Sequence, residues 1–364
     1  MPNHMNPTRA FQPDYASAPG ATVADMLDQV GMTQMELAQR LGVSPKHINQ
    51  VVKGVASISA ELALGLEKVF GVSTAFWLNR QSLYRADIAR QKESRELASA
   101  LDWAKSFPVA ELRKRRLISS STGPDLVNEL LHFFAIASPK LWSDPVAAYR
   151  KSQRFESDEK ALATWLRLGE IEAAAIECAP FDNERFHEAV REARGLTRLN
   201  PAEWEPALIR ICAHAGVAVV IVDTFRGARA NGATRWLSPT KALIQMSLRH
   251  RWEDIFWFSF FHEAAHVLLH GKKRIFIEGT GLPRDHSLQQ WEEEADRFAS
   301  RTLVPPEHDH ELRRLTLTDI PTFAEQIGVD PGIVVGRLQH ERLIPNQRGN
   351  ELRHRLAFAE QEPQ

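Results

Sequence analysis

Hydrophobic residues recur at helical spacing along most of the chain, interrupted by glycine and proline. From Thr22 to about Arg85, short amphipathic segments each end at a glycine, which predicts a compact domain of short helices. These glycines are Gly31, Gly42, Gly54 and Gly71. Residues 86–200 are rich in Ala, Leu, Glu and Arg at the same spacing, and we expect a helical middle region there. Its breaks are Pro108, Pro139 and Pro180.

The pattern changes to that of strands after residue 215. Gly216–Asp223, GVAVVIVD, is a β-branched run of strand length, and WLSPTKALIQMS predicts a turn between two further strands. Helical spacing returns at Glu253–His270 and Leu288–Leu303, and then continues to a polar tail. The predicted fold class is α+β, mostly helical, with a small β-sheet.

Composition restricts the classes of function. The chain is 43% hydrophobic and 25% charged, and its 45 Lys+Arg balance 46 Asp+Glu, so any DNA binding must depend on a local basic face. Cys178 and Cys212 lack disulfide or metal spacing, which fits a reducing cytoplasm. The first twenty residues lack the order of a signal peptide, and the apolar stretch Ile255–Leu269 is too short to span a bilayer. We expect a cytoplasmic protein without a membrane segment.

The segment FHEAAHVLLHG contains the motif H-E-x-x-H within a strong helical pattern. Residues four apart lie on one helix face, so His262 and His266 can present ring nitrogens to one zinc ion, while Glu263 is rotated toward the water that the ion holds. Zinc lowers the pKa of bound water to about 7, and Glu263 can accept the proton as hydroxide attacks a polarised carbonyl. The motif therefore predicts amide hydrolysis.

A catalytic zinc ion needs a third protein ligand. Downstream, WEEEADRFAS places Glu292 and Asp296 four apart on one helix face. We interpret Glu292 as the third ligand because an acid follows it by four residues; Glu293 and Glu294 are the alternatives. Asp296 would accept the second ring N–H of a zinc-bound histidine, with His262 as the preferred partner. The competing interpretations are a histidine-bearing surface helix and a zinc site without turnover.

FHEAAHVLLH followed by EEEADRFASRTLVP resembles the ImmA/IrrE family of zinc peptidases, and the resemblance covers roughly residues 205–345. It implies a gluzincin-like core, with His262, His266 and Glu292 as ligands and Glu263 as the base. For several members it also implies cleavage of a helix-turn-helix repressor during stress or induction of prophages and mobile elements. Asp296 stands where many relatives have Asn, a change that should preserve or strengthen the hydrogen bond.

The segment MTQMELAQRLGVSPKHINQVVKG predicts two short helices joined by a tight turn. Thr33 and Glu36 form a capping box, Gly42 ends the first helix, and Ser44 caps the second with Pro45 at its first position. The residues spaced to pack the helices together are Leu37, Ala38, Leu41, Val43, Ile48 and Val52.

The second of these helices is suited to the major groove of DNA. No acid occurs between Ser44 and Ala60, and Asn and Gln can pair with adenine edges while Lys reaches guanine or phosphate. The predicted DNA-binding residues are Thr33, Gln34, Ser44, Lys46, His47, Asn49, Gln50 and Lys53. The alternative is a packing module of the same shape that binds no DNA.

Residues 18–85 resemble the XRE-type repressor domain, most closely that of HigA-like antitoxins, through the flanks APGATVADMLDQVGMTQ and LALGLEKVFGVSTAFWLNRQSLYR. The resemblance implies a homodimer on a palindromic double-stranded DNA operator. AEQIGVDPGIVVGRL, residues 324–338, echoes this motif, but apolar residues occupy the positions of a DNA reader. We interpret the echo as a packing module against the peptidase, and the basic run Arg113–Arg116 as a solvated helix face.

The length and these transitions predict five segments. They are a flexible lead-in at 1–20, a helix-turn-helix DNA-binding domain at 21–85, a helical middle region at 86–200, a zinc metallopeptidase core at 201–310, and a C-terminal helical packing module with a polar tail at 311–364.

Two functions fit these segments. The first is a DNA-binding regulator with zinc-dependent endopeptidase activity toward a repressor-like or toxin-like protein. The second is a HigA-like repressor and antitoxin whose zinc domain senses a signal or binds a partner. We favour the first and expect proteolysis to be switched, with single-stranded DNA and a partner protein as the two candidate activators.

Overall fold

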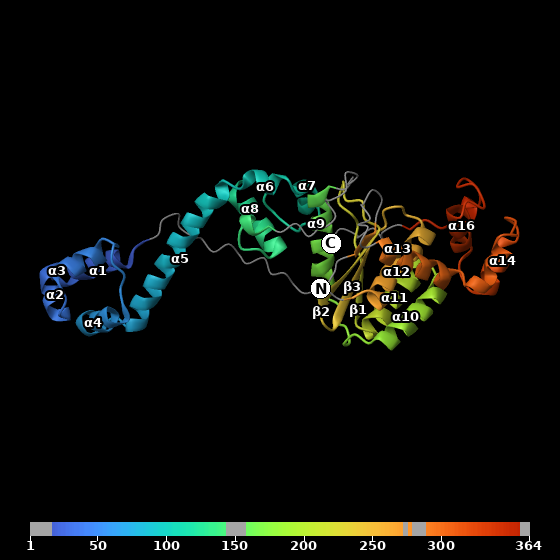
Figure 1. Cartoon of the computed structure of the whole chain (residues 1–364). Helices are drawn as coiled ribbons and strands as arrows, with labels where there is room; N and C mark the ends of the chain where they lie inside the picture. The colour runs from blue at the N-terminus through green and yellow to red at the C-terminus, as the bar shows by residue number, and fades with distance from the viewer. Residues whose placement is uncertain (1–16, 143–157, 272–275, 279–288, 357–364) are drawn as a thin grey trace. The chain divides into compact units, whose positions relative to one another are not determined.

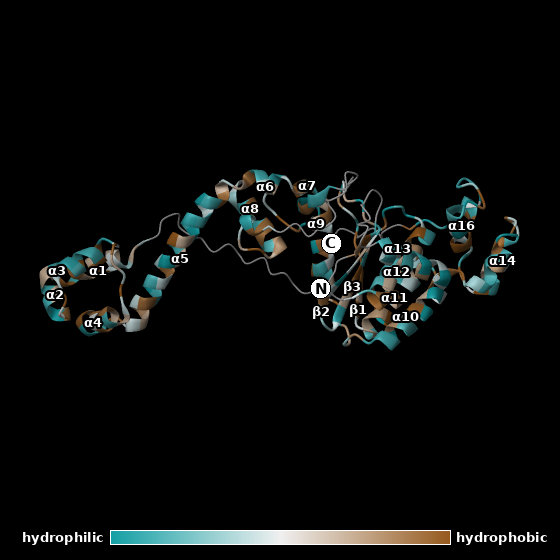
Figure 2. Cartoon of the chain, viewed as in Figure 1, coloured by the Kyte–Doolittle hydropathy of each residue, from teal (hydrophilic) through white to brown (hydrophobic). Residues whose placement is uncertain are grey.

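The computed structural model describes residues 17–142, 158–271, 276–278 and 289–356, so part of the predicted lead-in and of the polar tail lies outside the described residues. The chain divides into two compact units, Met1–Leu101 with Thr122–Val127, and Asp102–Ser121 with Asn128–Gln364. Figure 1 labels their helices and strands. Many of the helices carry both hydrophobic and hydrophilic residues (Figure 2).

The first unit is built from the short helices that the glycine spacing predicts. Its helices are α1 (Pro19–Val30), α2 (Gln34–Leu41), α3 (Pro45–Val52), α4 (Ala60–Phe70) and α5 (Thr74–Ala98). All four predicted glycines have a positive φ, between 64° and 73°, which is the left-handed conformation that ends a helix at low cost for glycine. The predicted capping box is present at the start of α2, and the Ser44 side chain caps α3.

The core of this unit differs from the prediction at one position of α3. Leu37, Ala38 and Ile48 are fully buried as expected, but Val51 lies in the core while Val52 is only partly buried. Val51 follows Ile48 by three residues, so the buried stripe turns by i+3 rather than i+4 at this point. Trp77 of α5 is fully buried in the same core, and Gln81 of α5 accepts a hydrogen bond from the Ile58 backbone N–H (2.8 Å).

The predicted boundary at residue 85 lies inside α5, which continues to Ala98. The helices that follow in the middle region are α6 (Leu101–Lys105), α7 (Val109–Lys114), α8 (Gly123–Phe134), the 3₁₀ helix η1 (Pro139–Leu141), α9 (Glu159–Ala174) and α10 (Asn183–Leu196). In the basic run, Arg115 donates hydrogen bonds to the Asp223 and Thr224 carbonyls and lies over the Phe225 ring. Arg115 is therefore engaged within the second unit rather than solvated.

The sheet forms where the sequence predicts strands, with one strand more. Its order is β1 (Val217–Ile221), β3 (Lys241–Met246), β2 (Gly232–Ser238) and β4 (Phe276–Glu278); β1 and β3 are parallel and the other pairs antiparallel. Val219 and Ile244 face the core that α10 to α12 cover, and Gln245 on the opposite face donates to the Trp165 carbonyl of α9. Within the second unit the sheet therefore lies between α9 on one face and α10 to α12 on the other (Figure 1).

The remaining helices complete the second unit. They are α11 (Pro201–His214), α12 (Glu253–Leu269), α13 (Gln289–Leu303), the 3₁₀ helix η3 (Pro306–His308), α14 (Asp309–Leu312), α15 (Ile320–Ile327), α16 (Pro331–His340) and the 3₁₀ helix η4 (Asn350–Leu352). Ile333, Val335 and Leu338 of α16 are buried in one core with Phe256 and Phe260 of α12, so the echoed segment packs as predicted. No helix among the described residues is both long and apolar enough to cross a membrane.

Candidate metal centre and DNA-reading helix

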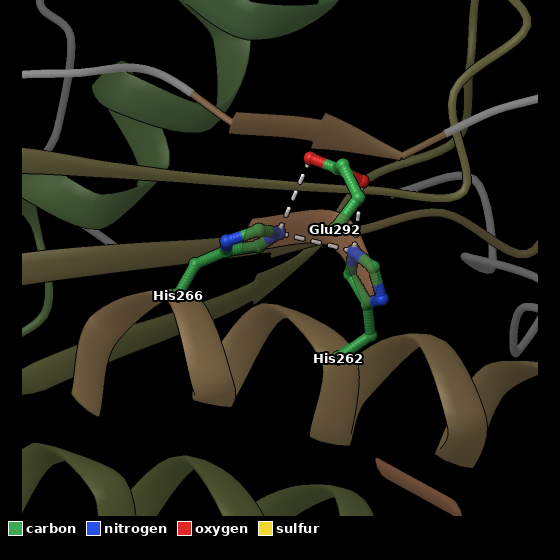
Figure 3. A group of neighbouring side chains, drawn as sticks. All are labelled: His262, His266 and Glu292. Carbon is green, nitrogen blue, oxygen red and sulfur yellow. Dashed lines mark hydrogen bonds and ion pairs between the residues drawn. The ribbon is translucent and has the colours of Figure 1, made fainter. Parts of the chain in front are cut away.

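Two histidines of α12 and one glutamate of α13 converge on one point (Figure 3). The Nε2 atoms of His262 and His266 are 3.0 Å apart. Glu292 places Oε2 3.4 Å from His262 Nε2 and Oε1 3.6 Å from His266 Nε2. Each residue offers one ligand atom, and these atoms all lie within 4.8 Å of one another, so the three residues can hold one metal ion.

Burial of α12 fixes these histidines. The helix is apolar on nearly all sides, and Trp257, Phe260 and Phe261 are fully buried. A helix that is hydrophobic all round belongs inside a core, and here α12 packs between the sheet and α13. His262 and His266 are each only 1% exposed, so their ring orientations are set by packing.

Asp296 and Glu263 take different places around the triad. Asp296 Oδ1 lies 2.9 Å from His262 Nδ1, the ring nitrogen that is turned away from Glu292. Glu263 is fully buried, and neither carboxylate oxygen has a hydrogen-bond partner among the described residues. Gly232 of β2 leaves the space for this side chain, because a Cβ there would lie 2.7 Å from Glu263 Cγ. Thr234 of the same strand donates to the Glu263 carbonyl at 3.0 Å.

Burial and neighbouring charges shift the pKa values of these groups in different directions. Burial raises the pKa of Glu263 to about 8, and the neighbouring His262 partly opposes this rise. Burial, with His262 and His270 nearby, lowers the pKa of His266 to about 2, so its ring is neutral and has a lone pair to offer. Burial also opposes charging of His262, but hydrogen bonds to Asp296 and Glu292 raise its pKa well above the usual value. A bound cation would favour the ionised Glu263 and the neutral His262.

Two residues near the triad, His270 and Glu278, were not predicted from the sequence. His270 follows His266 by four residues, and its Nδ1 lies 2.8 Å from His266 Nδ1. Glu278 of β4 has a buried Oε2 without a hydrogen-bond partner among the described residues, and its charge raises the pKa of both Glu263 and His262. The repeated spacing of four could have identified His270. The apolar run before Glu278, in IFIE, residues 275–278, is too short to predict a strand.

A pocket of about 310 Å³ lies where α12, α13, α16 and β4 meet, and it reaches the site through Asp296, the partner of His262, without being lined by the triad itself. Its walls are largely apolar, with Ile255, Phe258 and Ile333 among them, and Asp296 and Glu278 line it on the side of the triad. Ser259, 1% exposed, also lines it, and its Oγ has no partner among the described residues. The pocket therefore offers an apolar space with polar groups beside the candidate metal centre.

In the other unit, the predicted DNA-binding residues lie on and beside α3. Lys46 and Lys53 are exposed, whereas His47, Asn49 and Gln50 are half-buried rather than fully outward. Asn49 Nδ2 donates to Gln34 Oε1 at 3.2 Å, which joins α3 to the start of α2. The hydroxyls of Thr33 and Ser44 accept backbone N–H groups as helix caps.

Two segments of the chain match models of known families. Residues 23–77 match the family model of the helix-turn-helix, and residues 250–339 match the Peptidase M78 model, the IrrE N-terminal-like domain. The chain thus contains a segment similar to XRE-like helix-turn-helix domains, followed by a segment similar to the IrrE/ImmA-like peptidase domain, in the order that the sequence motifs predict. The second match spans α12, α13 and nearly all of α16.

Individual relatives match over short stretches. The chain is 37% identical to virulence-associated protein I of Dichelobacter nodosus over 67 residues, 18% of this chain and 62% of that protein. It is 29% identical over 66 residues to the uncharacterized HTH-type transcriptional regulator YddM of Escherichia coli (strain K12), 18% of this chain and 70% of that protein. The chain therefore spans about three-fifths of the length of the first of these relatives.

Solved structures of antitoxins are also similar to a short part of the chain. An addiction module antidote protein of the HigA family from Coxiella burnetii is 31% identical and covers 22% of this chain and 90% of that chain, with a TM-score of 0.22. The antitoxin HigA of Pseudomonas aeruginosa, solved with the higBA promoter, is 30% identical over the same shares, with a TM-score of 0.22.

Proposed function

We propose that this protein is a DNA-binding regulator with zinc-dependent endopeptidase activity toward a protein regulator. The observation that carries the peptidase half is the convergence of His262, His266 and Glu292 beside a buried Glu263 whose carboxylate has no partner among the described residues. A buried carboxylate without a hydrogen-bond partner lowers folding stability by about 1–3 kcal/mol or more. A group kept at this cost is a candidate for a direct role in the reaction. The substrate, such as a repressor-like or toxin-like protein, belongs to the proposal.

The donor set fits zinc. Two neutral imidazole nitrogens and one carboxylate are the ligands of many catalytic zinc sites, and they leave one position open. Zinc bound by His262, His266 and Glu292 would supply the Lewis acidity that polarises a peptide carbonyl and acidifies water. The hydrogen bond from His262 Nδ1 to Asp296 holds the ring with Nε2 directed at the triad.

In the proposed hydrolysis, Glu263 performs the proton transfers. The Glu263 carboxylate removes a proton from the attacking water as a C–O bond forms at the peptide carbonyl carbon. It then returns the proton to the amide nitrogen as the C–N bond breaks, which yields a carboxylate and an amine. The low exposure of Glu263 keeps bulk water away from this proton. The apolar pocket beside the triad accommodates a side chain of the polypeptide.

The peptidase proposal is tested by variants that separate metal binding from proton transfer. His262→Ala, His266→Ala and Glu292→Ala should each lower zinc occupancy, because each removes one ligand. Glu263→Gln should keep zinc and abolish cleavage, because the amide cannot accept the proton. Zinc content is measured by elemental analysis, and cleavage is measured against proteins encoded beside the gene. Full proteolytic activity in Glu263→Gln would remove the general-base role.

The helix-turn-helix half is proposed to bind a double-stranded DNA operator as a homodimer. Its support is the family match over residues 23–77 and the polar residues of α3, which are exposed or half-buried. Replacing Asn49 and Gln50 with Ala should weaken specific binding by about 1–3 kcal/mol for each lost bidentate base contact. Binding to the promoter upstream of the gene is measured by titration, and the Gln34→Ala variant reports the contribution of the Asn49–Gln34 pair. Unchanged affinity in the double variant would mean that another surface reads DNA.

A second function is supported by the relatives of the N-terminal segment, which include an HTH-type transcriptional regulator. In this alternative the protein acts mainly as an antitoxin-like repressor, and the metal centre senses a signal or binds a partner. The Glu263→Gln variant discriminates the two: normal regulation of the promoter and of a neighbouring toxin by this variant would favour the alternative.

A further inference from the structure

His266 contacts a third histidine on the side of its ring that faces away from Glu292. The facing Nδ1 atoms of His266 and His270 are 2.8 Å apart, and His270 Nε2 lies 3.2 Å from Glu294 Oε2. The His270 side chain is only 2% exposed, whereas Glu294 reaches the surface at 36%. The three side chains therefore form a continuous chain of contacts from the candidate metal centre to solvent.

The chemistry of these atoms fixes where the protons lie. Two ring nitrogens 2.8 Å apart must share one N–H, because two lone pairs or two N–H groups would repel. An ionised carboxylate only accepts, so Glu294 requires a proton on His270 Nε2. A neutral His270 then has a lone pair on Nδ1, and His266 Nδ1 must carry the shared proton. This leaves the His266 Nε2 lone pair directed toward His262 and Glu292.

Stacked aromatic rings hold this geometry. The Phe276 ring stacks on His266 with centroids 4.0 Å apart and planes 12° apart. The Trp291 ring stacks on His270 with centroids 5.3 Å apart and planes 23° apart. Gln290 donates to the other oxygen of Glu294 at 2.9 Å, so the carboxylate is also held in place. Both rings and the carboxylate are thus restrained before any metal binds.

We propose that His270 and Glu294 are positioning residues that set the tautomer of His266 for metal binding, a counterpart on the His266 side to the Asp296 contact of His262. The inference deepens the proposed function and rests on it for the identity of the metal. The hydrogen bonds that link Glu294, His270 and His266 raise the basicity of His266 Nε2. They also restrict rotation of the His266 ring, so less entropy is lost when the metal binds.

The test measures zinc affinity of the full-length protein by competition with a fluorescent chelator. His270→Phe keeps a flat ring between Trp291 and Phe276 but offers no acceptor, and zinc affinity should fall about 10- to 100-fold. Glu294→Ala should lower it in the same direction by less. Glu294→Gln should retain affinity, because its carbonyl oxygen still accepts from His270 Nε2. Glu293→Ala is the matched control, because it removes the same charge from the same helix at a residue that accepts a hydrogen bond from Gln289 and lies outside the triad.

A spectroscopic readout separates positioning from general damage. In metal-free protein labelled with ¹⁵N-histidine, NMR should show His266 as the Nδ1–H tautomer, and His270→Phe should shift it toward Nε2–H. Wild-type zinc affinity in both His270→Phe and Glu294→Ala, or an Nε2–H tautomer of His266 in the wild type, would overturn the proposal. If His270→Phe does not fold, Glu294→Ala and Glu294→Gln still decide it. A protein that shows the tautomer and binds zinc but never cleaves would instead contradict the peptidase function.

Discussion

Gly232 of β2 lies against the Glu263 side chain. A methyl group at this residue would lie 2.7 Å from Cγ and 2.8 Å from Oε1 of Glu263, closer than real contacts allow. We expect Gly232→Ala to displace the carboxylate and lower kcat by about 10- to 100-fold, since a shift of 1 Å in a catalytic group can cost that much. The three proposed metal ligands lie on α12 and α13 rather than on β2, so zinc content should not change.

The control for this prediction is Ala233→Gly, which also exchanges Ala and Gly in β2, at a neighbouring position. Cleavage rate and zinc content are measured on the same samples. A Gly232→Ala protein with normal turnover would mean that Glu263 has room to move without loss of function.

At the level of single residues, spacing along one helix was enough to predict part of the site. His262, Glu263 and His266 follow from the four-residue period, and Glu292 with Asp296 follows from the same period on a second helix. The structure brings the two groups together. Glu278 could not be predicted, because no spacing rule relates a residue of a strand to residues of a helix. The surroundings of the Glu263 carboxylate could not be predicted either, because they include β2, which only the fold brings close to α12.

The start of α12 depends on an ion pair between distant elements. Arg353, just after η4, donates to both oxygens of Asp254 at 2.9 and 2.8 Å, and the two side chains are only 8% and 7% exposed. Gly336 of α16 allows this approach, because a Cβ there would lie 2.4 Å from Asp254 Oδ2. The pair therefore ties the C-terminal segment and α16 to the helix that carries the candidate metal ligands.

Breaking this buried pair should be costly. Arg353→Ala leaves the Asp254 carboxylate buried without its partner, and the free energy of unfolding of the second unit should fall by about 3–5 kcal/mol. Urea denaturation followed by tryptophan fluorescence measures this change. The matched control, in the same unit, is Glu341→Ala, which breaks a more exposed pair with Arg337 and should cost less than about 1 kcal/mol. Equal stability of the two variants would show that the buried pair does not hold α12.

Elements with long, regular patterns were predictable, and short or distant ones were not. The strand GVAVVIVD, the following two strands and helices α12 and α13 appear within a few residues of their predicted bounds. Strand β4 has three residues, too few for an alternation to stand out. The Asp254–Arg353 pair joins residues 99 apart, and nothing in local sequence indicates such a contact.

At the scale of the whole molecule, one chain joins a segment that matches the helix-turn-helix model to a segment that matches the Peptidase M78 model. The two family matches are separated by residues 78–249, which include the rest of α5, the helices α6 to α11 and most of the sheet. The sequence predicts this order of parts but not the limits of the units, because helical spacing continues across them. The extent of each domain therefore stays a prediction.

The linkage of these two parts leads us to predict that proteolysis is switched, because an endopeptidase acting without restraint on cellular proteins would be harmful. Switching requires a ligand that binds the active arrangement better than the resting one, and an activation of at least tenfold corresponds to about 1.4 kcal/mol of such preference. The candidate ligands are single-stranded DNA and a partner protein.

Cleavage of candidate repressors and toxins is assayed with zinc present, with and without duplex DNA, single-stranded DNA and each protein encoded beside the gene. Glu263→Gln serves as the inactive control. Activation by duplex DNA would couple the operator to the peptidase directly, and activation by a partner alone would leave the helix-turn-helix with a role in targeting the promoter. Constant and rapid cleavage under every condition would contradict the switch. It would mean that none of these ligands prefers the active state, and a ligand that binds both states equally cannot shift their populations.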